Sequence, residues 1–309
     1  MDAFYSDRFV LPLPAGHRFP MEKYRLLRER IGQTLPEIRL LEPEPLTDEA
    51  LAVAHSPDYI RRLVGGDLSR KEMMAIGFPW SPEMVERSRR SAGATVMACR
   101  AAFRDGVGIN LAGGTHHAYR DRGEGFCCFN DAVVAARLMQ REGLATKCLV
   151  IDLDVHQGNG TAAMTRDDSN IFAFSMHAAE NYPFVKERSD LDIELPDRTG
   201  DAMYLETLRA ALIQIRTQFL PSLVIYLAGA DPFCDDRLGR LALTKDGLLA
   251  RDRQVFEFVR GLGVPMAIAM AGGYGRTIQD TVDIHFQTVN CALQYANNKS
   301  GPSEPVLSH

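Results

Sequence analysis

From residue 108 onward, short apolar runs alternate with longer segments in which apolar residues recur every three or four positions. A continuous apolar run predicts a strand buried on both faces, and the longer periodic segments predict helices. The predicted strands are 108–114, 147–154, 171–177, 222–231 and 264–274. The predicted helices are 129–142, 201–218, 244–262 and 276–295. This alternation indicates an α/β fold in which helices cover both faces of a mostly parallel sheet, a three-layer α/β/α arrangement.

The first hundred residues have a more helical pattern. The predicted helices are 21–33, 47–63 and 82–104. The last of them begins after Ser81-Pro82, a pair that often starts helices. Residues 63–81 lack a regular pattern and are expected to form a loop, and the polar tail 297–309 is expected to be frayed. No linker rich in Pro, Gly or Ser separates two halves, so we expect a single domain over residues 1–296.

Composition and charge narrow the class of protein. The 309 residues are 46% hydrophobic and 24% charged, as in ordinary globular proteins. The net charge is −5 and no long block of Lys and Arg is present, which argues against nucleic acid as a partner. No apolar stretch approaches the roughly 20 residues that span a bilayer, and the N-terminus lacks a signal-peptide pattern. We therefore expect a cytoplasmic protein with no membrane partner.

The six cysteines show no C-x-x-C pair and no spacing typical of disulfides. This pattern fits a reducing compartment, in which most cysteines serve as small core residues. Cys127 and Cys128 are adjacent, so we expect at most one of them to face a cavity.

Chemically capable side chains follow four of the five predicted strands. They are His116 and His117, then Asp152, Asp154 and His156, then Asp231, and finally Tyr274. In open α/β sheets, ligands bind beyond the carboxyl ends of the strands. The sequence therefore predicts that these groups meet in one site.

The stretch "DLDVHQGNG" places Asp152, Asp154 and His156 at alternate positions as the chain leaves a strand. Alternate residues of an extended segment share a face. Three buried polar groups would cost several kcal/mol unless a cation or a hydrogen-bond network compensates them. Gly158 and Gly160 then permit a sharp turn into a helix.

Asp154, His156 and a third ligand from another strand end would form a three-ligand site with an open position, the arrangement of catalytic zinc. Asp231 is the best third ligand, although a helix N-cap or a surface-loop acid is the alternative. Asp235 and Asp236 follow it closely, and we expect both to be solvated.

Adjacent histidines in a Gly-rich loop are often packed without function, but His116 and His117 lie beside the other candidates. An imidazole near a metal can act as a general base when a partner fixes its tautomer. Asp152 is a suitable partner for one histidine and Asn159 for the other.

Tyr274 follows Gly272 and Gly273, which allow the backbone to approach closely. Its hydroxyl could donate to a developing oxyanion, or the side chain could simply be buried with the hydroxyl on a carbonyl; position alone does not separate the two. A metal, a base and an oxyanion donor together favour hydrolysis of an amide or ester carbonyl.

These motifs resemble the zinc-dependent histone deacetylase and acetylpolyamine amidohydrolase family, which has the arginase/deacetylase fold. The similarity runs from about Phe4 to Leu293, with the motifs in the family's order. They are "GGTHHAYRDRGEGFCCFND", "IDLDVHQGNGTA", "FSMH", "AGADPFCDDRLGRLALT" and "AGGYG". Among the branches, "DRGEGFC", "DLDVHQGNG" and "DRLGRL" are most similar to class IV deacetylases.

The resemblance implies one Zn²⁺ on Asp154, His156 and Asp231. It implies His117 as general base and acid, His116 as its electrostatic helper, and Tyr274 as the group that polarises the substrate carbonyl. The second metal of the related ureohydrolases is not expected, because Gly158, Pro232 and Phe233 replace the acids that it needs.

The same resemblance implies a structural K⁺ held by Asp152 and Ser175. Asn159 stands where class I members have an Asp, which should alter the basicity of His117. The implied walls of a narrow acyl-lysine tunnel are Phe126 and Tyr182, with Gly125, Gly272 and Gly273 beside the substrate.

The expected activity is hydrolysis of acyl-lysine amides in a protein or peptide. The nearest alternative substrate is an acetylpolyamine or another small acylated amine, and a rival from another class is a non-catalytic acyl-lysine binding protein. The acyl length, the physiological target and the oligomeric state stay open.

Overall fold

A single parallel sheet forms the centre of the molecule in a computed structural model that describes residues 1–11, 13–14 and 16–297. The eight strands lie in the order β2-β1-β3-β8-β7-β4-β5-β6, and every neighbouring pair is parallel. The predicted α/β class with a parallel sheet is thus confirmed. The predicted tail lies outside the described residues from position 298 on.

The strands are short. They are β1 (Asp2–Phe4), β2 (Arg39–Leu41), β3 (Val107–Asn110), β4 (Cys148–Asp152), β5 (Ile171–Ala178), β6 (Leu191–Leu195), β7 (Leu223–Leu227) and β8 (Met266–Ala269). The central strands are buried along their whole length, as their continuous apolar runs predict. Side chains of β4 alternate between the two faces, with Leu149 and Ile151 in one apolar cluster and Val150 in the other.

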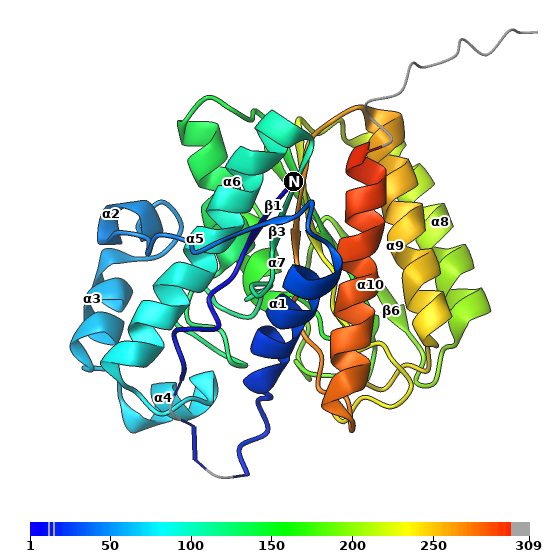
Figure 1. Cartoon of the computed structure of the whole chain (residues 1–309). Helices are drawn as coiled ribbons and strands as arrows, with labels where there is room; N and C mark the ends of the chain where they lie inside the picture. Colours follow the sequence, from blue (N-terminus) through cyan, green and yellow to red (C-terminus); the bar gives the residue numbers. More distant parts are fainter. Residues whose placement is uncertain (12, 15, 298–309) are drawn as a thin grey trace, which may run out of the picture.

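Helices cover both faces of the sheet (Figure 1). On one face pack α1 (Glu22–Thr34), α8 (Asp201–Gln218), α9 (Lys245–Leu262) and α10 (Ile278–Asn297). On the other face lie α2 (Asp48–Leu51), α3 (Pro57–Gly65), α4 (Arg70–Ile76), α5 (Pro82–Asp105), α6 (Asp131–Arg141) and α7 (Asn159–Thr165). The result is the predicted three-layer α/β/α arrangement.

Three strands were missed by the apolar pattern. β1 and β2 have three residues each, too few to show a period. β6 is one of the two edge strands of the sheet, and most of its residues are only partly buried. A half-exposed strand can contain polar residues on its exposed face. The continuous apolar run that identifies the central strands is therefore absent from β6.

One helix prediction and one loop prediction in the first hundred residues were wrong. The expected helix 47–63 is broken into α2 and α3, because Ser56 caps α3 through a 3.2 Å bond from the Tyr59 amide and Pro57 occupies its first turn. The expected loop 63–81 contains α4, which begins with a reciprocal capping box between Ser69 and Glu72.

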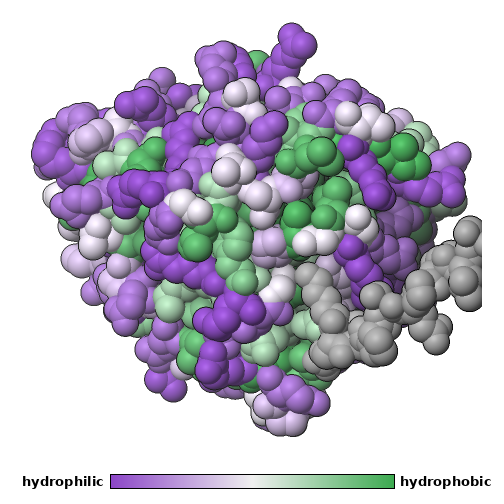
Figure 2. All heavy atoms as spheres, turned by 90° about the horizontal axis from the view of Figure 1, so that it is seen from above, coloured by the Kyte–Doolittle hydropathy of each residue, from purple (hydrophilic) through white to green (hydrophobic). Residues whose placement is uncertain are grey.

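All strands run in one direction, so their carboxyl ends gather at one edge of the sheet. Figure 2 looks onto the opposite face, at the amino ends, where hydrophilic residues alternate with small hydrophobic groups. Among the residues that the structure describes, no helix combines the length and the apolar character needed to cross a membrane.

Candidate active site

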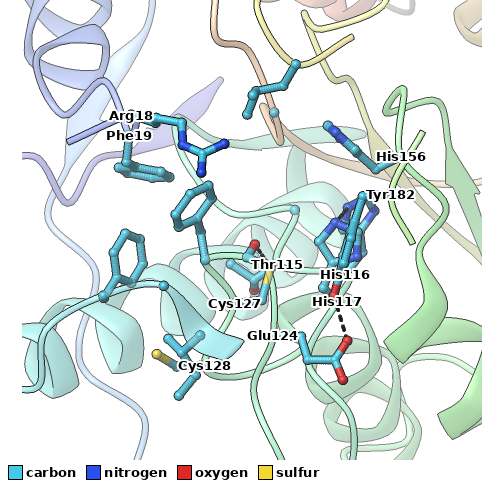
Figure 3. Close-up of a pocket in the computed structure, with 18 of the residues that line it drawn as sticks. Arg18, Phe19, Thr115, His116, His117, Glu124, Cys127, Cys128, His156 and Tyr182 are labelled. Atoms are coloured by element: carbon cyan, nitrogen blue, oxygen red, sulfur yellow. Dashed lines mark hydrogen bonds between the residues drawn. The ribbon is translucent and has the colours of Figure 1, made fainter. Parts of the chain in front are cut away.

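A cavity of about 1030 Å³ opens at the carboxyl ends of the strands. His116 and His117 reach it from the loop after β3, Asp154 and His156 from the loop after β4, and Tyr274 from the loop after β8. In Figure 3 the two histidines and Tyr182 stand on one side of the cavity, with Phe19 and Arg18 on the other. The structure therefore brings together the side chains that the strand-end argument grouped.

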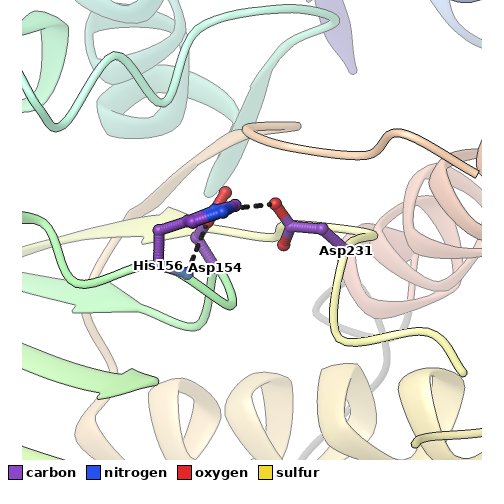
Figure 4. Close-up of side chains that lie close together, drawn as sticks. All are labelled: Asp154, His156 and Asp231. Atoms are coloured by element: carbon purple, nitrogen blue, oxygen red, sulfur yellow. Dashed lines mark hydrogen bonds and ion pairs between the residues drawn. The ribbon is translucent and has the colours of Figure 1, made fainter. Parts of the chain in front are cut away.

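Asp154, His156 and Asp231 offer ligand atoms that all lie within 4.8 Å of one another (Figure 4). His156 Nδ1 is 2.9 Å from Asp154 Oδ1 and 3.4 Å from Asp231 Oδ2. The second separation is an ion-pair distance, and Asp231 Oδ2 is buried without a hydrogen bond. An unsatisfied buried carboxylate oxygen that faces an imidazole and a second carboxylate fits a bound divalent cation.

Backbone amides hold the carboxylates of Asp154 and Asp231 in place by hydrogen bonds. Val155 N donates to Asp231 Oδ1 at 2.9 Å, and Gly272 N donates to Asp154 Oδ2 at 2.8 Å. A Cβ at position 272 would lie 2.0 Å from Asp231 Oδ2 and 2.5 Å from Asp154 Oδ2. Only glycine lets the β8 loop approach the two acids so closely.

Asp154, His156 and Asp231 lie so close together that the charge of each one shifts the pKa of the others. Burial and the neighbouring Asp154 carboxylate raise the pKa of Asp231 to about 7. Burial opposes the charged form of His156, but the two carboxylates outweigh it and raise its pKa to about 10. Two adjacent buried carboxylates therefore repel each other, and a cation between them would remove this repulsion. The donor set of two oxygens and one nitrogen fits zinc.

The adjacent histidines differ in their partners. His116 Nδ1 lies 2.7 Å from Asp152 Oδ2, and His117 Nδ1 lies 2.7 Å from Asn159 Oδ1. These are the two pairings that the sequence suggested. The Nε2 atoms of the two rings are 3.2 Å apart.

The two imidazoles also differ in basicity. Burial works against the charged form of His116, but Asp152 and Asp154 raise its pKa to about 9. Burial, together with the charges of His116 and His156, lowers the pKa of His117 well below its ordinary value. Of the pair, His117 is thus the one held neutral and able to accept a proton.

Tyr274 lines the cavity, and its phenol remains protonated because burial and then the Asp154 and Asp231 carboxylates raise its pKa well above the ordinary value. Its backbone amide donates to Asp236 Oδ2 at 2.6 Å. The expectation of a solvated Asp236 was wrong, because the side chain is buried and also accepts from the amides of Leu238 and Gly239. The Asp235 side chain is half exposed, which agrees with the expectation of a solvated acid.

Aromatic side chains form the walls of the cavity. Phe126 and Tyr182 line it, as predicted, and Phe126 adopts a φ of 67° that follows Gly125 at 53°. A Cβ at Gly125 would lie 2.6 Å from His117 Cδ2, so this glycine lets the wall approach the base. Phe19 and Phe78 extend the wall around Phe126, at ring-centroid distances of 5.3 Å and 5.2 Å.

Sequence reasoning missed these two phenylalanines because both come from segments with no recognisable motif. It also missed any role for Glu124, although this residue stands inside the quoted "DRGEGFCCFND" and lines the cavity. The expectation that at most one of Cys127 and Cys128 faces a cavity was wrong, because both line it. The turn made by Gly125 and Phe126 removes the strand-like alternation on which that expectation rested.

Several predicted residues support the site from behind the cavity wall. Asp152 is paired in register with Ser175 on the neighbouring strand, and Ser175 Oγ lies 2.9 Å from His177 Nδ1. Gly273 has a φ of 151° and packs against Ala230 and Thr281. The involvement of Asp152 and Ser175 in K⁺ binding stays a prediction.

The sequence and the structure were compared with those of known proteins. Residues 17–289 match the sequence profile of the histone deacetylase domain. An uncharacterised protein of Picosynechococcus is 43% identical over 285 residues, which covers 91% of this chain and 94% of that protein. Histone deacetylase 2 of Arabidopsis thaliana is 31% identical, covering 81% of this chain and 68% of its own. The crystal structure of an HDAC homologue from Aquifex aeolicus superposes with a TM-score of 0.80 at 25% identity, covering 94% of this chain and 83% of that one.

Proposed function

The chain belongs to the histone deacetylase family, and from this premise we propose that it is a zinc-dependent amidohydrolase that removes acyl groups from the ε-amine of lysine. The observation that carries the proposal is the convergence of Asp154, His156 and Asp231 within 4.8 Å, beside a neutral, buried His117. A metal-binding cluster next to a base suits hydrolysis by water without a Ser or Cys nucleophile.

Asp154, His156 and Asp231 would hold the ion. When bound, Zn²⁺ acts as a Lewis acid on the substrate carbonyl and makes water a stronger nucleophile at neutral pH. The protein's own contribution is to hold the ligands in place through the amides of Val155 and Gly272.

His117 would act as general base and then general acid. With Nδ1–H donated to Asn159 Oδ1, its Nε2 carries the lone pair that takes a proton from the attacking water. The same nitrogen then returns the proton to the departing amine. His116, paired with Asp152, would add positive charge beside the developing oxyanion.

Tyr274 would donate its phenolic hydrogen to the oxygen of the substrate carbonyl as negative charge develops there. Its raised pKa keeps that hydrogen in place. Asp236 contributes indirectly, because it holds the backbone of Tyr274 at the cavity wall.

The cavity favours a substrate with a slender apolar stem. Phe126 and Tyr182 would flank the methylene chain of an acyl-lysine, and Gly125, Gly272 and Gly273 leave room for the backbone turns around it. An acetylpolyamine carries positive charges that need acids nearby. Apart from the metal ligand Asp154, two acids line the cavity, Glu124 and Glu180, against three arginines, Arg18, Arg87 and Arg240. A lining without an excess of acids favours acyl-lysine over a polycation.

Further expectations complete the proposal. Asp152 and Ser175 would hold a structural K⁺ near His116, residues 1–296 would form the catalytic domain, and the protein would act in the cytoplasm.

The experiment assays purified protein, with metal content measured on the same sample, against acyl-lysine peptides of increasing acyl length and against acetylated polyamines. We expect release of free acid from the peptides in proportion to bound zinc. Faster turnover of polyamines would replace lysine with a small amine as the substrate. Peptide binding without release of acid, in zinc-loaded protein, would make the chain a binding protein instead.

A further inference from the structure

Glu124 is the meeting point of three side chains at the wall of the cavity. Its Oε2 accepts a 2.7 Å hydrogen bond from the Tyr182 hydroxyl and a 3.3 Å hydrogen bond from Asn159 Nδ2. Its Oε1 accepts from Arg122 Nε at 3.0 Å. Figure 3 shows the carboxylate joined to Tyr182, directly beside His116 and His117. Glu124 is therefore separated from His117 by a single residue, Asn159.

Glu124 determines which group donates and which accepts in the hydrogen bonds that lead from it through Asn159 to His117. A carboxylate can only accept hydrogen bonds, whereas an amide can present either its oxygen or its NH₂ group. Glu124 therefore selects the orientation in which Asn159 Nδ2 points at the carboxylate. Asn159 Oδ1 is then left facing His117 Nδ1, 2.7 Å away, and must receive a hydrogen from it. The lone pair of His117 consequently remains on Nε2.

The carboxylate is itself held in place. The Glu124 amide donates to Cys127 O at 3.1 Å, and the Cys127 amide donates back to Glu124 O at 2.8 Å. The guanidinium of Arg122 stacks 3.5 Å from the centre of the Tyr119 ring while its Nε binds Glu124. The acceptor is thus fixed by backbone and side chain before any substrate arrives.

The same carboxylate fixes an aromatic wall. The Tyr182 ring meets the His117 ring edge to face, with centroids 4.9 Å apart and planes at 82°. Because its hydroxyl is tied to Glu124, this ring limits rotation of the imidazole. Glu124 thus constrains both the hydrogen-bond partner of His117 and the ring packed against it.

We propose that Glu124 is a positioning residue for the catalytic base. It acts through Asn159 to hold His117 as the Nδ1–H tautomer, and through Tyr182 to hold the wall against the imidazole. This inference rests on the proposed function for its effect on turnover, but its effect on the His117 tautomer does not depend on activity.

The test compares Glu124→Leu, Glu124→Gln and the control Glu187→Leu. Glu187 is a nearby carboxylate that contacts Tyr119 and Arg166 but not Asn159. The tautomer of His117 is measured by NMR on ¹⁵N-histidine-labelled protein, with and without zinc, and its signal among the eight histidines is assigned by its loss in His117→Ala. Melting temperatures identify variants that fail to fold.

We expect wild type and Glu187→Leu to show the Nδ1–H form. Glu124→Leu should shift His117 toward the Nε2–H form and lower kcat by about tenfold to a hundredfold with KM within about twofold. Glu124→Gln retains an acceptor oxygen, so its His117 tautomer and its kcat should lie between those of wild type and Glu124→Leu. This variant tests the role of Glu124 if the leucine variant does not fold. An unchanged tautomer in folded Glu124 variants overturns the proposal. Wild type with no amidase activity on any substrate would overturn the proposed function, and the tautomer would still decide the role of Glu124.

Discussion

The amide of Gly272 donates a 2.8 Å hydrogen bond to Oδ2 of Asp154, a residue 118 positions earlier in the chain. The loop after β8 thereby orients a carboxylate that leaves the sheet after β4. The contact is possible only because position 272 has no Cβ, which would lie 2.0 Å from Asp231 Oδ2. The geometry of the candidate metal site thus depends on a residue that is not itself a ligand.

Gly272→Ala should therefore weaken metal binding without removing a ligand. The new methyl must push the Asp154 and Asp231 carboxylates apart, and we expect a loss of about tenfold or more in zinc affinity. Competition with a chelator measures the affinity. Gly200→Ala is a matched control, because a Cβ there would meet only Ala242 O at an ordinary 3.8 Å and, as at Gly272, the backbone φ is not positive. Equal zinc affinity in the two variants would contradict the role assigned to Gly272.

Tyr274→Phe should lower kcat by about 10²-fold while zinc content and KM stay close to those of wild type. The reason is that only the donor to the developing oxyanion is lost, and that interaction is strongest in the transition state. Steady-state kinetics on an acyl-lysine peptide, with zinc measured on the same samples, provide the comparison. Unchanged turnover in zinc-loaded Tyr274→Phe would remove the hydroxyl from the mechanism.

Asp236→Ala should reduce activity although Asp236 is not a candidate metal ligand and does not itself line the cavity. Its side chain accepts from the amides of Leu238, Gly239 and Tyr274, and losing it leaves these donors unpaired and frees the Tyr274 loop. We expect a drop in kcat of about tenfold and a lower melting temperature. Asp235→Ala is the control, because this neighbouring acid forms only an exposed ion pair with Arg276. Similar kinetics in both variants would show that the loop needs no such anchor.

The free energy of unfolding should fall as the pH is lowered from about 6.5 to about 4, because His55 is buried in its neutral form. Burial lowers the pKa of this histidine to about 4, and its Nε2 accepts a 2.9 Å hydrogen bond from the Asn130 amide. The unfolded chain takes up a proton at His55 below about pH 6.5, and the folded protein does so only near pH 4. The free energy of unfolding should therefore decrease across this window, by an amount on the order of a few kcal/mol from this residue.

Urea unfolding of the metal-free protein at pH 7.5 and pH 4.5 measures that loss. His55→Gln keeps an acceptor for Asn130 but cannot titrate, so its stability should depend less on pH. The same decrease in wild type and variant would assign the pH dependence to other groups.

The central sheet and the ligand cluster could be predicted from the sequence because both follow from local rules. A buried parallel strand needs a continuous apolar run, and the polar residues at its carboxyl end face the region where ligands bind. Asp154 and His156 stand two positions apart in an extended segment, so their side chains share a direction before any tertiary contact is known. Asp231 joins them because β7 lies beside β4.

The missed features depend on contacts between distant segments. "DPFCDDR" looks like a solvated acidic turn, and nothing local shows that Asp236 binds the amide of Tyr274, 38 residues away. Glu124 lies in a recognisable motif, but its partner Tyr182 comes from the loop after β5, 58 residues further on. Such pairs become visible only once the loops at the carboxyl ends of the strands have been folded over one another.

The central claim is that Asp154, His156 and Asp231 share one catalytic zinc ion, and diffraction from crystals of zinc-loaded protein at the zinc absorption edge tests it most directly. We predict a single anomalous peak about 2.0–2.2 Å from one atom of each of the three side chains. A zinc peak bound elsewhere, or an empty cluster in crystals of a sample whose turnover requires zinc, would contradict the account.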